Sequence, residues 1–170
     1  MFEFFIFLNL IKCIKKIIFI SFFSYRIVIS LNVNHTVDSA EEDDGAEEAP
    51  EMKSQPNFEI DIVKPSGQTL SFSCSFIGQD EEPPSAEGDE FNDVFAIDEV
   101  TMFKGEDWSD KKYAVAGDIL DGHLYDLFMN MLNDRGIDRK FAERLSDYCS
   151  AYEHGMYIEM LEQLNKFASS

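Results

Sequence analysis

The feature that most constrains the fold is an alternation of apolar and polar residues that recurs along the chain. It is first clear in "RIVISLNVN", residues 26–34, where apolar side chains occupy every second position: Ile27, Ile29, Leu31 and Val33. Polar residues fill the other positions, apart from Val28. A period of two residues is typical of a strand with one buried face. The pattern therefore predicts a half-buried strand over residues 26–33.

The alternation returns in the next ordered part of the chain. In "NFEIDIVKPSGQTLSFSCSF", residues 57–76, two alternating runs flank a Pro-Ser-Gly turn, so the pattern predicts a β-hairpin with one apolar face. Another strand is predicted in "VFAIDEVTMF", residues 94–103. There the apolar positions change face near Asp98, which predicts a β-bulge. A short strand is expected in "KKYAVAG", residues 111–117.

The last third of the chain has the pattern of two helices. In "DILDGHLYDLFMNMLNDRG", residues 118–136, apolar residues recur every three or four positions, and Gly136 supplies a helix stop. Asp138 is expected to cap a second helix that runs from about Arg139 to Phe167. At roughly 1.5 Å per residue this helix would exceed 40 Å, so its far end should need a partner helix or a neighbouring subunit. Strands followed by helices predict an α+β fold.

Charge limits the classes of partner. The chain has 170 residues, enough for one domain with a real core, and a net charge of −19. Residues 1–30 carry four basic and one acidic side chain, a charge of +3, which leaves −22 for residues 31–170. Such a surface disfavours strong direct binding of nucleic acids and attracts basic proteins, cationic peptides or metal ions.

Fourteen of the 33 acidic side chains lie in two segments that are predicted to be flexible loops, residues 38–56 and 79–92. The first contains "DSAEEDDGAEEAPE" and the second follows within "QDEEPPSAEGDEFND". Strand patterns flank the first segment on both sides, so it is a loop tethered at each end to one sheet rather than a tail. The candidate partner-binding residues are the carboxylates of these segments: Asp38, Glu41, Glu42, Asp43, Asp44, Glu47, Glu48, Glu51, Asp80, Glu81, Glu82, Glu87, Asp89 and Glu90.

Motifs for catalysis, metals or cofactors are absent from the sequence. No glycine spacing matches a phosphate-binding or dinucleotide-binding loop, and the three histidines lack metal-ligand spacing. Cys74 occupies an apolar strand position, which predicts a buried, inert thiol. An acid–base hydrolase would require two carboxylates that converge in a pocket. We therefore expect no catalytic residue, no metal site, no cofactor and no enzymatic activity.

The apolar basic segment 1–25 differs from the rest of the chain. Lys12, Lys15 and Lys16 divide its apolar residues into two short runs, which makes it a poor membrane span. Their spacing places the lysines on one side of a helix, as in organelle import sequences. Three interpretations stay open: a targeting segment, a membrane anchor, or an artefact of gene prediction.

The ordered part of the chain, about residues 26–170, resembles the mitochondrial glycoprotein family. The resemblance rests on "PNFEIDIVKPSGQTLSFSCSF", "DVFAIDEVTMF", "EDWSDKKYAV" and above all "LYDLFMNMLNDRGIDRKFAERLSDYCSAYEHGMYIEMLEQLNKF". It implies a strongly twisted antiparallel sheet flanked by helices, in a ring-shaped homotrimer. It also implies an acidic, non-enzymatic protein of the mitochondrial matrix that is linked to mitochondrial translation and oxidative phosphorylation.

The resemblance also implies partners. Three copies of residues 31–170 would carry about three times −22, or −66, which favours basic proteins or peptides, including proteins of the mitochondrial ribosome or RNA-associated proteins. The alternative is a membrane-anchored or cell-surface acidic receptor for ligands like the complement Q subcomponent, with residues 1–25 in contact with the membrane. Family members have an import presequence, an N-terminal helix and a first strand, which the apolar segment replaces here. Either this segment packs against the terminal helix instead, or the natural protein is longer.

Overall fold

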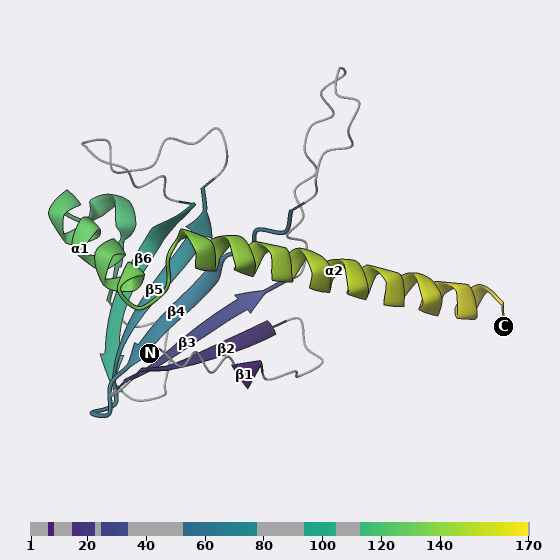
Figure 1. Cartoon of the computed structure of the whole chain (residues 1–170), viewed down its shortest axis with the longest axis horizontal. Coiled ribbons are helices and arrows are strands. Elements are labelled where there is room, and N and C mark those ends of the chain that lie inside the picture. Colours follow the sequence, from purple (N-terminus) through teal and green to yellow (C-terminus); the bar gives the residue numbers. More distant parts are fainter. Residues whose placement is uncertain are drawn as a thin grey trace, which may run out of the picture.

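A computed structural model describes residues 25–33, 53–77, 94–104 and 113–169, with the backbone of two N-terminal strands at 7–8 and 15–22. One seven-stranded antiparallel sheet follows the order of the chain, and both helices of the described residues come after it (Figure 1). The predicted α+β class is confirmed. The strands are β1 (Phe7–Leu8), β2 (Lys15–Phe22), β3 (Tyr25–Asn32), β4 (Phe58–Val63), β5 (Gln68–Phe76), β6 (Phe95–Lys104) and β7 (Ala114–Ala116).

The predicted alternation of the strands is confirmed in β3, β4 and β5. Their apolar residues point to one face of the sheet and form the core, where Ile29, Ile60 and Phe72 are fully buried. The hairpin between β4 and β5 turns at Gly67, whose φ of 77° suits a residue without a Cβ. Its turn is closed by the Gly67 amide, which donates to the Lys64 carbonyl at 2.9 Å.

The β-bulge predicted near Asp98 is also present. Ser73 of β5 pairs with Glu99 of β6, and the next residue of β5, Cys74, pairs with Ile97, so Asp98 is the extra residue. The Ile97 amide donates to the hydroxyl of Tyr125 at 3.1 Å in a buried position. A side chain on one of the helices therefore hydrogen-bonds to the backbone beside the bulge.

The segment before β3 requires a correction. β2 pairs with β3 along its full length, from Lys15 opposite Asn32 to Phe22 opposite Tyr25. The expectation that a strand is missing before Arg26 is therefore wrong, and so is the helical interpretation of Lys15 and Lys16. The residues of β2, "KKIIFISF", are rich in β-branched and aromatic types that favour strands, and they pair with the edge that β3 would otherwise expose.

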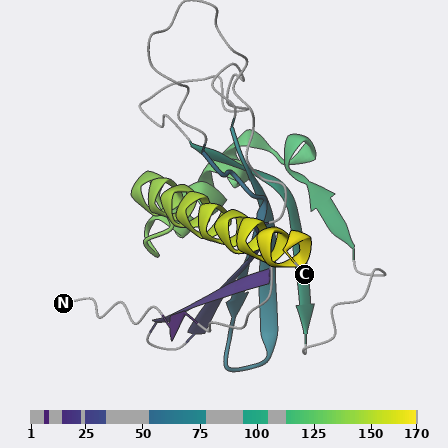
Figure 2. The same ribbon diagram turned by 90° about the vertical axis from the view of Figure 1, so that its right-hand side faces the viewer.

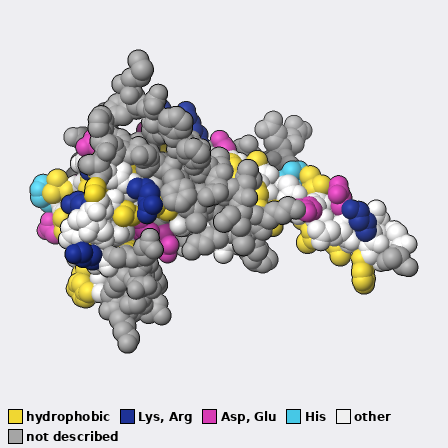
Figure 3. All heavy atoms as spheres, turned by 90° about the horizontal axis from the view of Figure 1, so that it is seen from below, with side chains coloured by type: hydrophobic (Ala, Val, Ile, Leu, Met, Phe, Trp, Pro, Cys, Tyr) yellow, Lys and Arg dark blue, Asp and Glu magenta, His cyan; other side chains and the backbone are white. Residues whose placement is uncertain are grey.

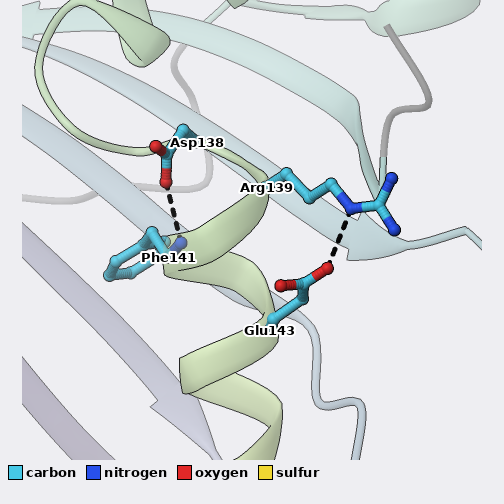
Figure 4. Close-up of polar contacts among 4 residues, drawn as sticks. All are labelled: Asp138, Arg139, Phe141 and Glu143. Carbon is cyan, nitrogen blue, oxygen red and sulfur yellow. Dashed lines mark hydrogen bonds and ion pairs between the residues drawn. The ribbon is translucent and has the colours of Figure 1, made fainter.

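Two helices, both capped by aspartates, follow the sheet: α1 (Gly122–Asn133) and α2 (Arg139–Ala168). Asp138 accepts a hydrogen bond from the Phe141 amide at 2.8 Å, and Arg139 pairs with Glu143 one turn along α2 (Figure 4). Gly136, with φ of 79°, lies in the turn that ends α1. The predicted cap and helix stop are both confirmed.

α2 crosses the sheet and continues beyond it (Figures 1 and 2). It has 30 residues and a length of about 45 Å. Its first half buries Ala142, Leu145 and Cys149 against the core. Its second half has an apolar stripe that the sheet does not cover, formed by Tyr157, Leu161, Leu164 and Phe167, of which Phe167 is 82% exposed. Within the described residues, the sheet thus does not cover the far end of the helix. This agrees with the expectation that so long a helix extends beyond its own domain.

Candidate acidic binding surface

The sheet topology attaches the two predicted acidic loops to the same end of the sheet. In an antiparallel meander, β3 and β5 finish where β4 and β6 begin. The register shows this directly, because Leu31 lies opposite Phe58 and Phe76 lies opposite Phe95. The β3–β4 and β5–β6 connections therefore leave the same end of the sheet, which we call the acidic end.

The predicted partner-binding residues themselves fall outside the described part of the chain. All fourteen lie between Val33 and Lys53 or between Ile77 and Val94. Their positions stay a prediction. The structure does describe the four residues next to these segments: Val33, Ser54, Ile77 and Val94. Their positions limit how far the acidic side chains can lie from the end of the sheet.

The first acidic segment is attached at both ends to buried structure. Val33, which precedes the segment, is buried, and Ser54, which follows its last carboxylate, is fully buried. The Ser54 amide donates to the Ser150 hydroxyl at 2.8 Å, and the Ser54 carbonyl accepts from the Ser146 hydroxyl at 2.8 Å. This serine clamp, formed by Ser54, Ser146 and Ser150, holds the end of the segment against α2.

Replacing Ser146 with Ala should lower the free energy of unfolding by about 1–3 kcal/mol, because the buried Ser54 carbonyl loses its hydrogen-bond donor. Urea unfolding measures the change. The matched control is Ser169→Ala, which removes an exposed hydroxyl that also donates to a helix carbonyl, and should change stability by less than about 0.5 kcal/mol. Equal effects of the two substitutions would contradict a role for the clamp.

The second acidic segment begins and ends on a hydrogen-bonded pair. The Ile77 amide donates to the Val94 carbonyl at 3.0 Å. Directly below, the ring of Phe58 makes edge contacts with Phe76 and Phe95, each at 5.6 Å between centroids. An aromatic cluster from three strands therefore supports the acidic end.

The sequence analysis did not identify the acidic residues on the open face of the sheet. Glu59 and Glu99 both lie opposite Ser73, so they share one row across the strands. Asp98 accepts a hydrogen bond from Ser75 at 2.7 Å on this face, and Asp61 has a buried oxygen without a hydrogen-bond partner among the described residues. In the sequence these acidic residues alternate with core residues. That pattern predicts only that they face away from the core.

The side chains considered for chemistry have environments that the sequence predicted. Cys74 and Cys149 are fully buried. Burial, with a smaller effect of the Asp98 carboxylate, raises the pKa of the Cys74 thiol far above its ordinary value. Burial and then Glu153 raise the pKa of Cys149 to about 12. The prediction of a buried, inert thiol at Cys74 is confirmed.

His123 and His154 lie exposed on the helices, as expected of surface histidines. In the described residues, no three His, Cys, Asp or Glu side chains come together in a way that could hold a metal ion. None of the helices described is both long enough and apolar enough to span a membrane.

Comparisons with known proteins agree with this architecture. Residues 21–168 match the family model described as mitochondrial glycoprotein. The bovine protein named complement component 1 Q subcomponent-binding protein, mitochondrial, is 35% identical over 157 residues, which cover 85% of this chain and 55% of that protein. The human protein of the same name is 34% identical over 161 residues, with the same coverage. The chain thus spans about half the length of these relatives.

A nematode relative and a solved structure extend the comparison. Conserved regulator of innate immunity protein 3 of Caenorhabditis elegans is 32% identical over 153 residues, which cover 86% of this chain and 62% of that protein. A Leishmania major protein, described as a sequence homologue of human p32, has a TM-score of 0.65 at 18% identity, covering 92% of this chain and 77% of that one, and so supports the fold. On the family match and these identities, the chain belongs to the mitochondrial glycoprotein family.

Proposed function

We propose that this protein is a non-enzymatic acidic binding protein of the mitochondrial matrix, which captures basic proteins or peptides through the acidic end of its sheet. The observation that carries the proposal is the meander topology, because it attaches both acidic segments to the same end. The two segments together hold fourteen of the predicted partner-binding carboxylates. Charge concentrated in one place attracts cationic partners more strongly than charge spread evenly.

The proposal includes a homotrimer and service to mitochondrial translation and oxidative phosphorylation, with basic proteins of the ribosome or RNA-associated proteins as clients. The apolar stripe on the second half of α2 supports association, since the sheet of its own chain does not cover it. A neighbouring copy would bury this stripe and bring further acidic ends together. The names of the mammalian relatives, which include the word mitochondrial, support a mitochondrial location.

The test is a change of charge in the acidic segments. Six carboxylates of the first segment are replaced by their amides: Glu41, Glu42, Asp43, Asp44, Glu47 and Glu48. Association with a Lys- and Arg-rich peptide should become about tenfold to a thousandfold slower, because the steering field is weakened. Its dependence on salt should also become flatter. Stopped-flow fluorescence at several salt concentrations measures both quantities.

A control variant removes exposed carboxylates away from the acidic end. Glu159 and Glu162 are exposed on the second half of α2, far along the chain from either acidic segment. Their replacement by Gln should leave association nearly unchanged. If the six-site variant kept the affinity and salt dependence of the unmodified protein, charge-driven capture at the acidic end would have to be abandoned.

The name of the mammalian relatives favours a second candidate, a membrane-anchored or cell-surface acidic receptor that binds ligands like the complement 1 Q subcomponent. Residues 1–25 would then contact the membrane. Carbonate extraction of isolated mitochondria and of whole-cell membranes distinguishes the two. Recovery in the soluble matrix fraction excludes an anchor, whereas recovery in the membrane pellet excludes the matrix proposal.

A further inference from the structure

The outer side of α1 exposes leucines that its sequence pattern would place in the core. Tyr125 and Leu132 are the buried side chains of this helix, and Phe128 makes an edge contact with Phe72 of the sheet, 5.3 Å between centroids. Leu124 and Leu127 are 40% and 51% exposed instead. Residues three positions apart are neighbours on a helix surface, so these two form one apolar area.

A third exposed apolar side chain precedes the helix. Ile119 ends a short turn of 3-10 helix, Gly117–Ile119, and is 74% exposed. We define the α1 patch as Ile119, Leu124 and Leu127. In Figure 3, hydrophobic side chains are visible at the α1 end of the molecule, beside both acidic and basic side chains.

The charged residues that flank the α1 patch along the chain have one sign. Residues 113–134 contain four aspartates, all exposed, and no lysine or arginine: Asp118, Asp121, Asp126 and Asp134. Arg135, the next residue, turns inward. One of its terminal nitrogens donates to the Met131 carbonyl at 2.7 Å, and its guanidinium stacks over the Tyr25 ring at 5.2 Å from the centroid. The acidic rim of the patch is therefore not neutralised by the arginine next to it.

We infer that the α1 patch is a docking site for a basic amphipathic helix of a partner protein, with leucines or other apolar side chains on one face and lysines or arginines along its borders. The inference rests on the proposed capture of basic partners. It specifies that the captured part of the partner is a helix with one apolar face. The apolar area of the patch would contact the apolar face of such a ligand, and the carboxylates beside it would pair with the lysines or arginines. A helix supplies them because apolar residues at i, i+3, i+4 and i+7 share a face.

The stripe on α2 is a natural comparison, because it offers a leucine pair of the same spacing and similar exposure. Leu161 and Leu164 are 44% and 54% exposed. Their surroundings are mixed in charge, with Glu159 and Glu162 followed by Lys166. Within seven positions of the α1 leucines along the chain, all the fully charged side chains are aspartates, so charge complementarity favours α1 for a basic ligand.

The experiment uses the whole protein and three synthetic peptides. The first is an 18-residue amphipathic helix made of Leu, Lys and Ala, the second has the same composition in an order that removes the apolar face, and the third is an 18-residue oligolysine. The double variant Leu124→Ser with Leu127→Ser is compared with its match, Leu161→Ser with Leu164→Ser. Both change exposed positions, and circular dichroism establishes that each variant is folded.

We expect the α1 variant to bind the amphipathic peptide at least about tenfold more weakly than the unmodified protein, because two leucines lose their apolar contacts. Its affinity for oligolysine should stay within about twofold. The α2 variant should retain binding of the amphipathic peptide by each protomer, also where loss of the α2 stripe prevents the proposed association between copies. Fluorescence anisotropy with labelled peptides measures these affinities.

Three results would overturn the inference. The first is equal affinity of the unmodified protein for the amphipathic and reordered peptides, which would show that charge alone is recognised. The second is loss of binding in the α2 variant but not in the α1 variant. The third is failure of the unmodified protein to bind any of the peptides, including oligolysine. Only this third result would also count against the proposed capture of basic partners, so the two failures can be told apart.

Discussion

Replacing Gly117 with Ala is expected to lower the free energy of unfolding by about 3 kcal/mol or more. A methyl group at this position would overlap the carbonyl oxygen of Ile97, which belongs to the backbone of β6 and cannot rotate away as a flexible side chain would. Ile97 also donates its amide to Tyr125. Moving this strand would therefore disturb the bulge and the contact between sheet and α1 together. Urea or thermal unfolding measures the loss.

Gly155 provides the matched control in the same chain. It lies within α2, and nothing is within 4 Å of the position that its Cβ would take. Gly155→Ala should stabilise the protein by about 0.5–1 kcal/mol, since alanine favours a helix interior more than glycine does. A Gly117→Ala protein as stable as the unmodified one would show that β6 can shift freely, against the close packing described above.

Replacing Phe58 with Ala should cost about 3–5 kcal/mol, a large part of the 5–15 kcal/mol that usually stabilises a domain. Phe58 is almost fully buried, and its ring touches both Phe76 and Phe95 at the acidic end of the sheet. Alanine would leave a cavity beneath both acidic segments. Chemical denaturation, with the midpoint and slope fitted separately, measures the change.

The control for Phe58 keeps the apolar volume but loses the edge contacts between rings. Phe58→Leu should cost no more than about 1.5 kcal/mol. An alanine variant that loses less than the leucine variant would exclude Phe58 as the centre of the aromatic cluster. If only the slope changed, the substitution would have acted on the unfolded chain instead.

Much of the fold could be predicted because its local signals agree. The alternation in β3, β4 and β5 follows the pleat, and the change of face at Asp98 occurs where the bulge inserts one residue. The cap at Asp138 and the stop at Gly136 likewise depend on a few neighbouring residues. Each of these features is decided within about ten residues of chain.

The features that were wrong or missed depend on contacts between distant residues. β2 is a strand because β3 offers it an edge, which the spacing of its lysines does not report. Tyr125 is buried because its hydroxyl reaches the Ile97 amide, 28 residues away. Leu124 and Leu127 share the helical period of core residues, yet the sheet does not reach them. Periodicity shows which positions are apolar, whereas burial depends on what lies opposite.

In the candidate site, too, local features could be predicted from the sequence, whereas contacts between distant residues could not. The sequence identified the two acidic segments and predicted that strands flank the first, but it treated the segments separately. Their attachment to one end depends on the order and direction of β3, β4, β5 and β6, which only the complete sheet defines. The serine clamp could not be predicted from the sequence either, because Ser146 and Ser54 are 92 residues apart.

The attachment of the acidic segments has a consequence for how the protein can vary. Ser54 is clamped to α2 and Ile77 is bonded to Val94, so hydrogen bonds to the folded part of the chain mark where each segment is attached. The entropic cost of closing a loop grows only with the logarithm of its length, about 0.6 kcal/mol for each doubling. Insertions and deletions in these segments should therefore change the free energy of unfolding very little. The number of carboxylates can therefore change over evolution while the sheet that carries them stays the same.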